Sequence, residues 1–220
     1  MTSLDVCCLD AEHAPFGRAD TDLCLAMLRA ADMPSLVRVA DDSSTEIRNA
    51  LDSGATGILV PHVKSAAQAE RIVEAAHFGE GGRGYAGSTR AAHYTRKAMP
   101  DHIADSAQQT TVVVQIEDIA ALDQVDEIAQ VTGVHALFIG RADLAVAMGL
   151  SPGDDKVMQT VADICQASVA AGCAVGMFTP NVDEIPHWRS LGASLFLLSS
   201  DHSFILQGAQ QLAERCREGF

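Results

Sequence analysis

The chain has 220 residues, of which 48% are hydrophobic and 5% aromatic, so we expect one α/β domain with an aliphatic core. Its 29 acidic and 15 basic residues give a net charge of −14, which disfavours nucleic-acid and anionic-membrane partners. The six cysteines lack metal-ligand spacing, and neither an apolar run of about 18 residues nor a basic-then-apolar leader occurs. We therefore expect a soluble, cytoplasmic protein with reduced thiols.

A repeated unit organises the chain: a helical stretch ends at a glycine, and an apolar strand follows within a few residues. Glycine suits this place because the residue after a helix usually adopts the left-handed conformation. Strands are predicted at residues 4–10, 35–40, 57–63, 111–117, 135–140, 174–178 and 194–199. Helices are predicted at residues 21–31, 45–53, 66–76, 120–130, 156–171, 182–191 and 204–217. Residues 79–100 are expected to form a long loop.

Strands that alternate with helices indicate a parallel sheet. The strand middles are apolar, but polar residues such as Asp10, His62 and Glu117 stand at nearly every C-terminal end. This pattern favours a TIM-type (β/α) barrel over an open doubly wound sheet, in which the ligand binds at one switch point. We expect residues 1–220 to form one such barrel domain. Seven strands are found where a closed barrel has eight, so the first β/α unit is expected to be missing.

Two carboxylates are the first candidates for chemistry. Glu117 and Asp143 end consecutive strands, 26 residues apart in the sequence. Neighbouring strands lie about 4.8 Å apart, so both carboxylates can reach one point above the sheet. Such a site, without a cysteine or histidine pair, suits a hard cation, Mg²⁺ or Mn²⁺. The alternative is that both residues merely cap the following helices.

Three other residues are candidates with alternatives of their own. Asp10 could orient His13 as a base, although an isolated loop histidine is usually only solvated. Arg38 lies inside an apolar strand, so it either pairs with a structural acid or faces an anionic ligand. Lys64 could form a Schiff base, but its place at the start of a helix favours a solvated lysine.

Together, several segments resemble the HpcH/HpaI family, the class II pyruvate-dependent aldolases of the citrate lyase β-subunit superfamily. They occur in the family's order along nearly the whole chain. The segments are DAEHAPF (10–16), LVRV (36–39), DSGATGILVPHVKSAAQA (52–69), GRGYAGSTRAAHY (82–94), VVVQIED (112–118), FIGRADLAVAMG (138–149) and the final AVGMF…LGASLFLLSSDHS.

The resemblance implies a role for each matching residue. Glu117 and Asp143 match the family's metal ligands. His13 matches its base, paired with Asp10, and Arg38 matches the arginine that contacts the pyruvyl oxygens. Further matches concern the substrate: Gln115 stands near the ligand, and the backbone of Gly140, Arg141 and Ala142 receives its carboxylate. Arg141 replaces the proline usual in this motif, so its side chain either favours a more anionic substrate or points to solvent.

The resemblance further implies a metal-dependent aldolase that converts 4-hydroxy-2-oxo acids to pyruvate, or a related 2-oxo acid, and an aldehyde, and runs in reverse. The implied cofactor is Mg²⁺ or Mn²⁺, with Co²⁺ as a further candidate. We expect a homo-oligomer, a hexamer or trimer of dimers, with helix 204–217 packing on a neighbouring subunit. Family members carry another strand and helix before DAEH, which leaves part of the pocket wall unassigned. The alternatives are an acyl-CoA lyase, a class I aldolase using Lys64, and a non-catalytic binding or oligomerisation module.

Overall fold

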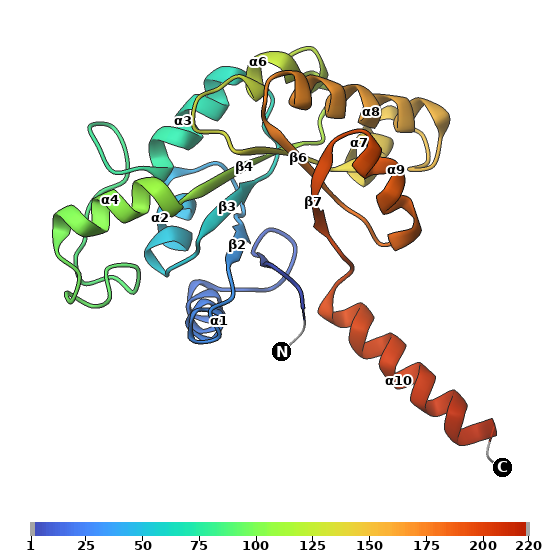
Figure 1. Cartoon of the computed structure of the whole chain (residues 1–220), viewed down its shortest axis with the longest axis horizontal. Coiled ribbons are helices and arrows are strands. Elements are labelled where there is room, and N and C mark those ends of the chain that lie inside the picture. Colours follow the sequence, from blue (N-terminus) through green and yellow to red (C-terminus); the bar gives the residue numbers. More distant parts are fainter. Residues whose placement is uncertain (1–2, 219–220) are drawn as a thin grey trace.

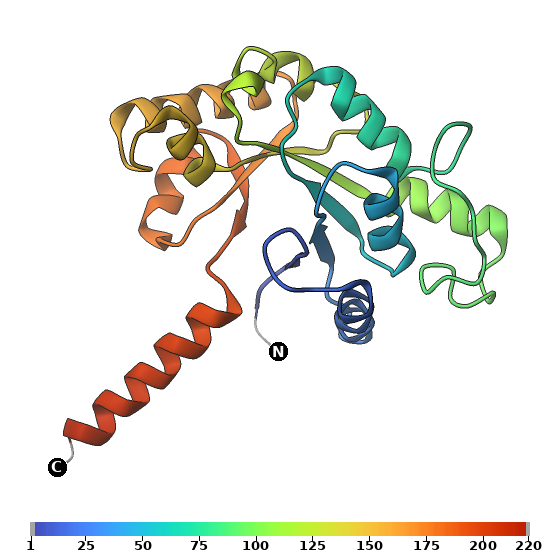
Figure 2. The same ribbon diagram turned by 180° about the vertical axis from the view of Figure 1, so that it is seen from behind.

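The strands form one parallel sheet whose order follows the chain. The computed structural model describes residues 3–218. Its strands are β1 (Cys7–Asp10), β2 (Ser35–Arg38), β3 (Gly57–Val60), β4 (Thr111–Ile116), β5 (Ala136–Ile139), β6 (Ala174–Phe178) and β7 (Ala193–Leu197). The sheet curls into an open half-barrel, with β1 and β7 as its edges within the described residues (Figures 1 and 2). The predicted α/β barrel with seven strands is confirmed.

Helices connect successive strands, mostly where the sequence predicts them. They are α1 (Arg18–Ala30), α2 (Ser44–Asp52), α3 (Ala66–Ala76), α5 (Ile119–Leu122), α6 (Val125–Ala129), α8 (Asp155–Ala170), the short 3₁₀ helix η1 (Val182–Glu184), α9 (Ile185–Ser190) and α10 (Asp201–Glu218). The single helix expected over residues 120–130 is therefore divided into α5 and α6, and the one expected over 182–191 begins as η1.

Two further helices were not predicted from the sequence. The helix α4 (Met99–Gln109) has a mostly polar sequence with one buried side chain, His102, so it lacks an apolar stripe. It follows the predicted loop and has a proline in its first turn, where proline is tolerated. The helix α7 (Arg141–Met148) is only eight residues long and begins directly after β5. Short helices give weak periodic signals, so α7 was missed because of its length and α4 because of its polar sequence.

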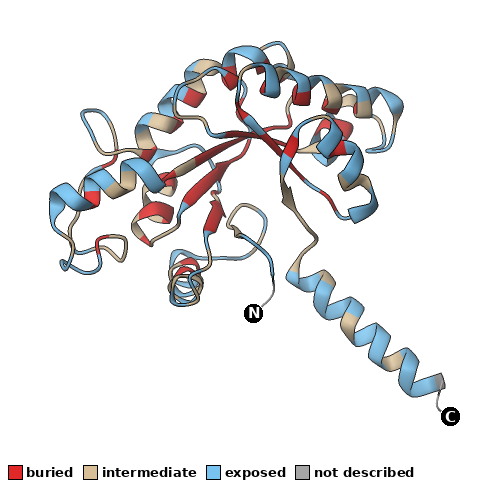
Figure 3. Cartoon of the chain, in the orientation of Figure 1, coloured by how far each residue is buried: buried red, intermediate tan, exposed pale blue. Residues whose placement is uncertain are grey.

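Alternating side chains divide the hydrophobic core between the two faces of the sheet. Leu36, Leu59 and Val113 belong to a small cluster on one face. Their neighbours in sequence, including Val37 and Ile58, belong to the larger cluster that packs with the helices. Successive residues of a strand point to opposite faces, which accounts for this division. The buried residues accordingly follow the sheet and the inner sides of its helices (Figure 3).

The last helix, α10, projects away from the half-barrel (Figures 1 and 2). Several of its large apolar side chains are exposed, including Ile205 at 68% and Leu206 at 70%. None of the helices within residues 3–218 combines the length and the hydropathy needed to cross a bilayer.

Candidate active site

Arg38 is held by two acids at the C-terminal ends of β1 and β2. In the parallel register, Arg38 lies opposite Asp10. Its Nε donates to Asp10 Oδ1 at 3.0 Å and its Nη2 to Oδ2 at 2.6 Å, while Nη1 lies 3.2 Å from Glu12 Oε2. Burial alone would lower the pKa of Arg38, but the bonds to Asp10 and the charge of Glu12 raise it. The guanidinium is therefore charged and fixed in orientation.

The environment of His13 differs from the expected one. Asp10 Oδ1 accepts hydrogen bonds from the backbone N–H groups of Glu12 and His13, at 3.1 and 3.2 Å. The imidazole instead lies near Glu12, with 3.8 Å between His13 Nε2 and Glu12 Oε2, and the side chain is 67% exposed. The expected pairing of Asp10 with the ring is corrected because Arg38 occupies the Asp10 carboxylate. Glu12, which the sequence did not single out, is the acid beside the imidazole.

Glu117 is a buried carboxylate just after β4, with an exposed fraction of 4%. Its Oε1 accepts a hydrogen bond from the backbone N–H of His62 at 2.8 Å, and its Oε2 accepts one from Gln115 Nε2. Burial raises the pKa of Glu117, contacts with His62 and Gln115 lower it, and the charge of Asp143 raises it. Asp143 therefore lies within electrostatic reach of Glu117. A cation would relieve both the burial and the repulsion between like charges.

Gly140 allows this packing because a side chain would not fit there. A Cβ atom built on Gly140 would lie 2.7 Å from Glu117 Cβ and 2.8 Å from Glu117 Oε2. The Gly140 backbone N–H donates to Ile116 O at 3.0 Å, which joins the ends of β4 and β5. Helix α7 starts at the next residue, with Asp143 exposed in its first turn and Ala142 exposed beside it. The segment that holds Asp143 thus begins in direct contact with Glu117.

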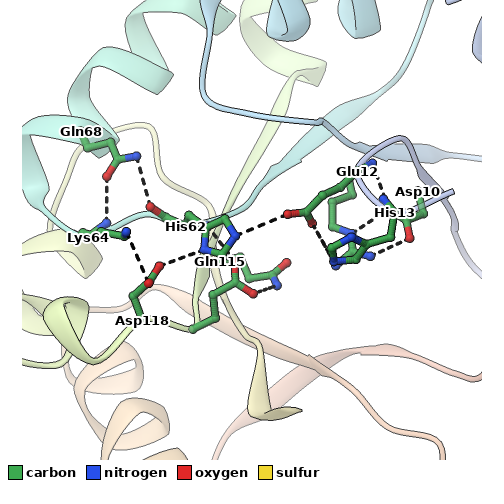
Figure 4. A network of polar contacts seen from close by, with 10 residues as sticks. Asp10, Glu12, His13, His62, Lys64, Gln68, Gln115 and Asp118 are labelled. Atoms are coloured by element: carbon green, nitrogen blue, oxygen red, sulfur yellow. Dashed lines mark hydrogen bonds and ion pairs between the residues drawn. The ribbon is translucent and has the colours of Figure 1, made fainter. Parts of the chain in front are cut away.

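His62 joins the two halves of the site (Figure 4). Its Nδ1 lies 3.0 Å from Asp118 Oδ2 and 3.3 Å from Glu117 Oε1, and its Nε2 lies 3.6 Å from Glu12 Oε1. Burial would lower the pKa of His62, but Asp118 and the other two acids raise it. The backbone φ of His62 is 55°, a left-handed value that is strained for this residue and typical of functional sites. Lys64 Nζ lies 3.4 Å from Asp118 Oδ1, in an exposed ion pair.

The donor set fits a divalent cation. Glu12, His62 and Glu117 offer ligand atoms within 4.8 Å of one another, and no other such group of three exists among residues 3–218. Asp143 is outside this group, although its charge acts on Glu117. Carboxylate oxygens with one imidazole suit Mg²⁺ or Mn²⁺ better than a soft metal. Two ligand sets are thus available, and both contain Glu117.

The side chain of Arg141 lies in neither of its expected places. Its Nη1 donates to Glu184 Oε2 at 2.6 Å, and the centre of its guanidinium lies 5.9 Å from the Trp188 ring. The hydrogen bond from Arg141 lowers the pKa of Glu184. Arg141 is therefore part of a structural ion pair between α7 and η1, which corrects its expected role as a substrate-binding side chain or a solvated one.

Comparisons with known proteins identify the family to which the chain is similar. The family model described as HpcH/HpaI aldolase/citrate lyase matches residues 1–207. A hydroxypyruvate/pyruvate aldolase from Paraburkholderia phytofirmans is 33% identical over 95% of this chain and 83% of its own. A 4-hydroxy-2-oxovalerate aldolase from Rhodococcus jostii is 34% identical over 94% and 81%. The crystal structure of an HpcH/HpaI aldolase/citrate lyase family protein from Burkholderia cenocepacia superimposes with a TM-score of 0.91, at 32% identity, covering 98% of this chain and 86% of that one.

Proposed function

The chain belongs to the HpcH/HpaI aldolase/citrate lyase family, and we propose that it is a divalent-metal-dependent, class II aldolase. Its proposed reaction cleaves 4-hydroxy-2-oxo acids to pyruvate, or a related 2-oxo acid, and an aldehyde, and also runs in reverse. The observation that carries the proposal is the convergence of Arg38, Glu117 and the His13–Glu12 pair at the C-terminal ends of the strands.

Glu117 and Asp143 are the proposed metal ligands, and Mg²⁺ or Mn²⁺ the proposed cofactor. When bound, the cation supplies Lewis-acid polarisation of the keto group of the oxo acid. Gln115 positions Glu117 through the hydrogen bond to Oε2, and Gly140 leaves room for the carboxylate. His62 holds Oε1 through its backbone N–H. These contacts fix the orientation of a buried carboxylate, as the neighbours of metal ligands commonly do.

Substrate binding falls to Arg38 and to the start of α7. Asp10 holds the Arg38 guanidinium in one orientation, so its charge meets the pyruvyl oxygens without a conformational search. The backbone N–H groups of Arg141 and Ala142 lie in the first turn of α7, where helix N–H groups lack intrahelical partners. We assign the substrate carboxylate to these groups.

The base is assigned to His13, whose exposed imidazole is open to an incoming 4-hydroxyl. His13 takes the hydroxyl proton, the oxygen forms the aldehyde carbonyl, and the electrons of the C3–C4 bond move to C3. The pyruvate enolate that remains beside Arg38 then takes a proton at C3 from water, and His13 returns its proton to the solvent. The carboxylate of Glu12 lies 3.8 Å from His13 Nε2, beside the ring that receives the proton.

The test is pyruvate release from a panel of 4-hydroxy-2-oxo acids, before and after metal removal with EDTA and after Mn²⁺ is restored. We expect the activity to disappear with EDTA, to return with Mn²⁺, and to be lost in Glu117→Ala. Glu127→Ala, which changes an exposed acid of α6, is the matched control. Full activity of metal-stripped enzyme would refute the proposal.

Three rival functions predict different outcomes in the same preparation. A lyase of the same superfamily would turn over CoA thioesters instead of free oxo acids. A class I aldolase would resist EDTA, and borohydride with pyruvate would trap an adduct on Lys64. The ion pair of Lys64 with Asp118 and its exposed side chain do not provide the desolvated site that activates a lysine. A non-catalytic module would bind Mn²⁺ and pyruvate without turnover.

We further propose a cytoplasmic homo-oligomer, a hexamer arranged as a trimer of dimers, in which α10 packs on a second copy. The exposed apolar side chains of α10 support this, and the six free thiols suit a reducing compartment. Light scattering should give a multiple of 23.2 kDa. Leu206→Glu should lower that mass, whereas Gln211→Glu should not. A wild-type monomer would contradict the proposal.

A further inference from the structure

A cavity lies at the opposite end of the strands from the proposed active site. Its volume is about 420 Å³, and its lining includes Ser35, Thr56 and Thr110, which stand at the N-terminal ends of β2, β3 and β4. Arg38 and Glu117, by contrast, stand at the C-terminal ends. The cavity is therefore separate from the aldolase site, and its size falls in the range of small-molecule sites.

The most unusual side chain in this cavity is Arg83. It is 6% exposed, its guanidinium lies 4.0 Å from the centre of the Phe78 ring, and its Nε lies 3.5 Å from Asp52 Oδ1. Within residues 3–218, the buried Nε of Arg83 lacks a hydrogen-bond partner. Burial lowers the pKa of Arg83, and the charge of Asp52 opposes this shift. A buried guanidinium normally has acceptors for its five donors, so Arg83 lacks the partners it needs.

His102 is a second buried polar group in the lining. It is 3% exposed, and its ring lies 5.3 Å from Phe78 and 5.8 Å from Tyr85. Its Nδ1 is buried without a partner among the described residues. The lining also holds the cations Arg29 and Lys97 and the carboxylates Asp32 and Asp105, and Lys97 forms an ion pair with Asp105.

The loop between α3 and α4 is held in place around the cavity. Arg29 of α1 donates to Arg90 O at 3.0 Å, and its Nη2 lies 2.6 Å from His93 Nε2. His93, Tyr94 and Thr95 have left-handed φ values of 52°, 53° and 72°. Three such residues in succession are unfavourable unless their surroundings fix them. The cavity wall is thus a defined structure, bound to the body of the protein through Arg29.

From these observations we propose that the cavity binds a small oxyanion, the phosphate or carboxylate group of a metabolite, through Arg83 and Lys97. Both groups have the planar or forked arrangement of oxygens that a guanidinium recognises with paired hydrogen bonds. The bound oxyanion supplies the acceptors that Arg83 lacks. Phe78 contacts both Arg83 and His102, and Tyr85 contacts His102, so the aromatic rings hold these two polar side chains in place.

The test is calorimetric titration of the full chain with inorganic phosphate and, separately, with succinate. We expect at least one of them to bind, and the tighter one identifies the oxyanion class. Arg83→Gln should weaken that binding about tenfold or more, because it removes a charge-assisted hydrogen bond. Lys97→Gln, at a more exposed position, should weaken it several-fold and guards against a folding defect in the Arg83 variant.

Two controls locate the binding event. Arg71→Gln removes an exposed arginine of α3 and should bind the oxyanion like wild type. Arg38→Gln alters the opposite end of the strands and should also leave binding unchanged. The proposal is overturned if neither anion binds wild type, if both cavity variants bind as wild type does, or if Arg38→Gln abolishes binding.

Discussion

Replacement of Gly140 by alanine tests how tightly the proposed metal site is packed. The added Cβ would lie 2.7 Å from Glu117 Cβ, whereas ordinary contacts begin at 3.4 Å, so one of the two must retreat by about 0.7 Å. The nearest atom is the base of the Glu117 side chain, which rotation cannot remove. Gln115 Nε2, at 3.0 Å, restricts the other direction. The end of β4 must therefore move relative to β5.

Such overpacking of a buried site typically costs roughly 1–3 kcal/mol of unfolding free energy. The displacement also shifts the Glu117 carboxylate, and misplacement of a metal ligand by its neighbours commonly lowers affinity about 10- to 100-fold. Gly140→Ala should thus show both effects together. Gly153→Ala is the matched control, since a Cβ there meets nothing within 4 Å.

Urea denaturation and Mn²⁺ calorimetry on the two variants provide the measurements. We expect Gly153→Ala to match wild type in both, and Gly140→Ala to lose stability and Mn²⁺ affinity. If Gly140→Ala changed neither the unfolding free energy nor the Mn²⁺ affinity, the packing argument would be refuted, because the Glu117 carboxylate would then have more space than the structure shows.

Two further predictions concern the ion pair of Arg141 with Glu184 and that of Arg38 with Asp10. Arg141 holds the pKa of Glu184 below its usual value, so their pair stabilises the fold above about pH 4.5 and loses this effect as the pH falls through the folded pKa. Arg141→Gln should lower the unfolding free energy by about 1 kcal/mol at pH 7 and leave KM unchanged. Urea denaturation measures the difference in unfolding free energy between wild type and variant, and a difference that stayed constant below pH 4.5 would contradict this. Arg38→Lys keeps the charge but loses the paired bonds to Asp10, so kcat/KM should fall about 10- to 100-fold. Steady-state kinetics with wild-type values for the lysine variant would exclude the assigned role of Arg38.

Much of the fold could be predicted because each β/α unit carries its own signals. Glycines such as Gly54 and Gly172 follow the ends of helices, with φ values of 100° and 72°, and apolar strands come after them. Parallel order then places every strand end at one edge, which is why the sequence could predict that Glu117 and Asp143 share one end of the sheet. Local pattern and global arrangement agree here, which makes the prediction reliable.

Contacts that depend on side-chain direction could not be predicted in the same way. The turn after β1 places Glu12, rather than Asp10, beside the His13 ring, and the backbone N–H groups of Glu12 and His13 donate to Asp10 within that turn. Arg141 finds Glu184, 43 residues later, because α7 and η1 are neighbours in space. Sequence spacing carries no information on such long-range pairs.

His62 is an intermediate case. Its place after the apolar segment GILVP indicated a strand end. Its contact with Glu117, however, depends on a left-handed backbone conformation, which cannot be predicted at a histidine as it can at a glycine. Strained residues of this kind are usual at functional sites, where local preference yields to function.

The most direct test of the metal site is a Mn²⁺ titration of wild type, Glu117→Gln, Asp143→Asn and His62→Gln, with Asp126→Asn of α6 as the control. If Glu117 and Asp143 hold the ion, the first two variants should lose the high-affinity site that wild type and the control retain, and His62→Gln should keep measurable binding. Wild-type affinity in Asp143→Asn, together with loss of binding in His62→Gln, would instead place the ion between Glu12, His62 and Glu117 and contradict the proposed ligand pair.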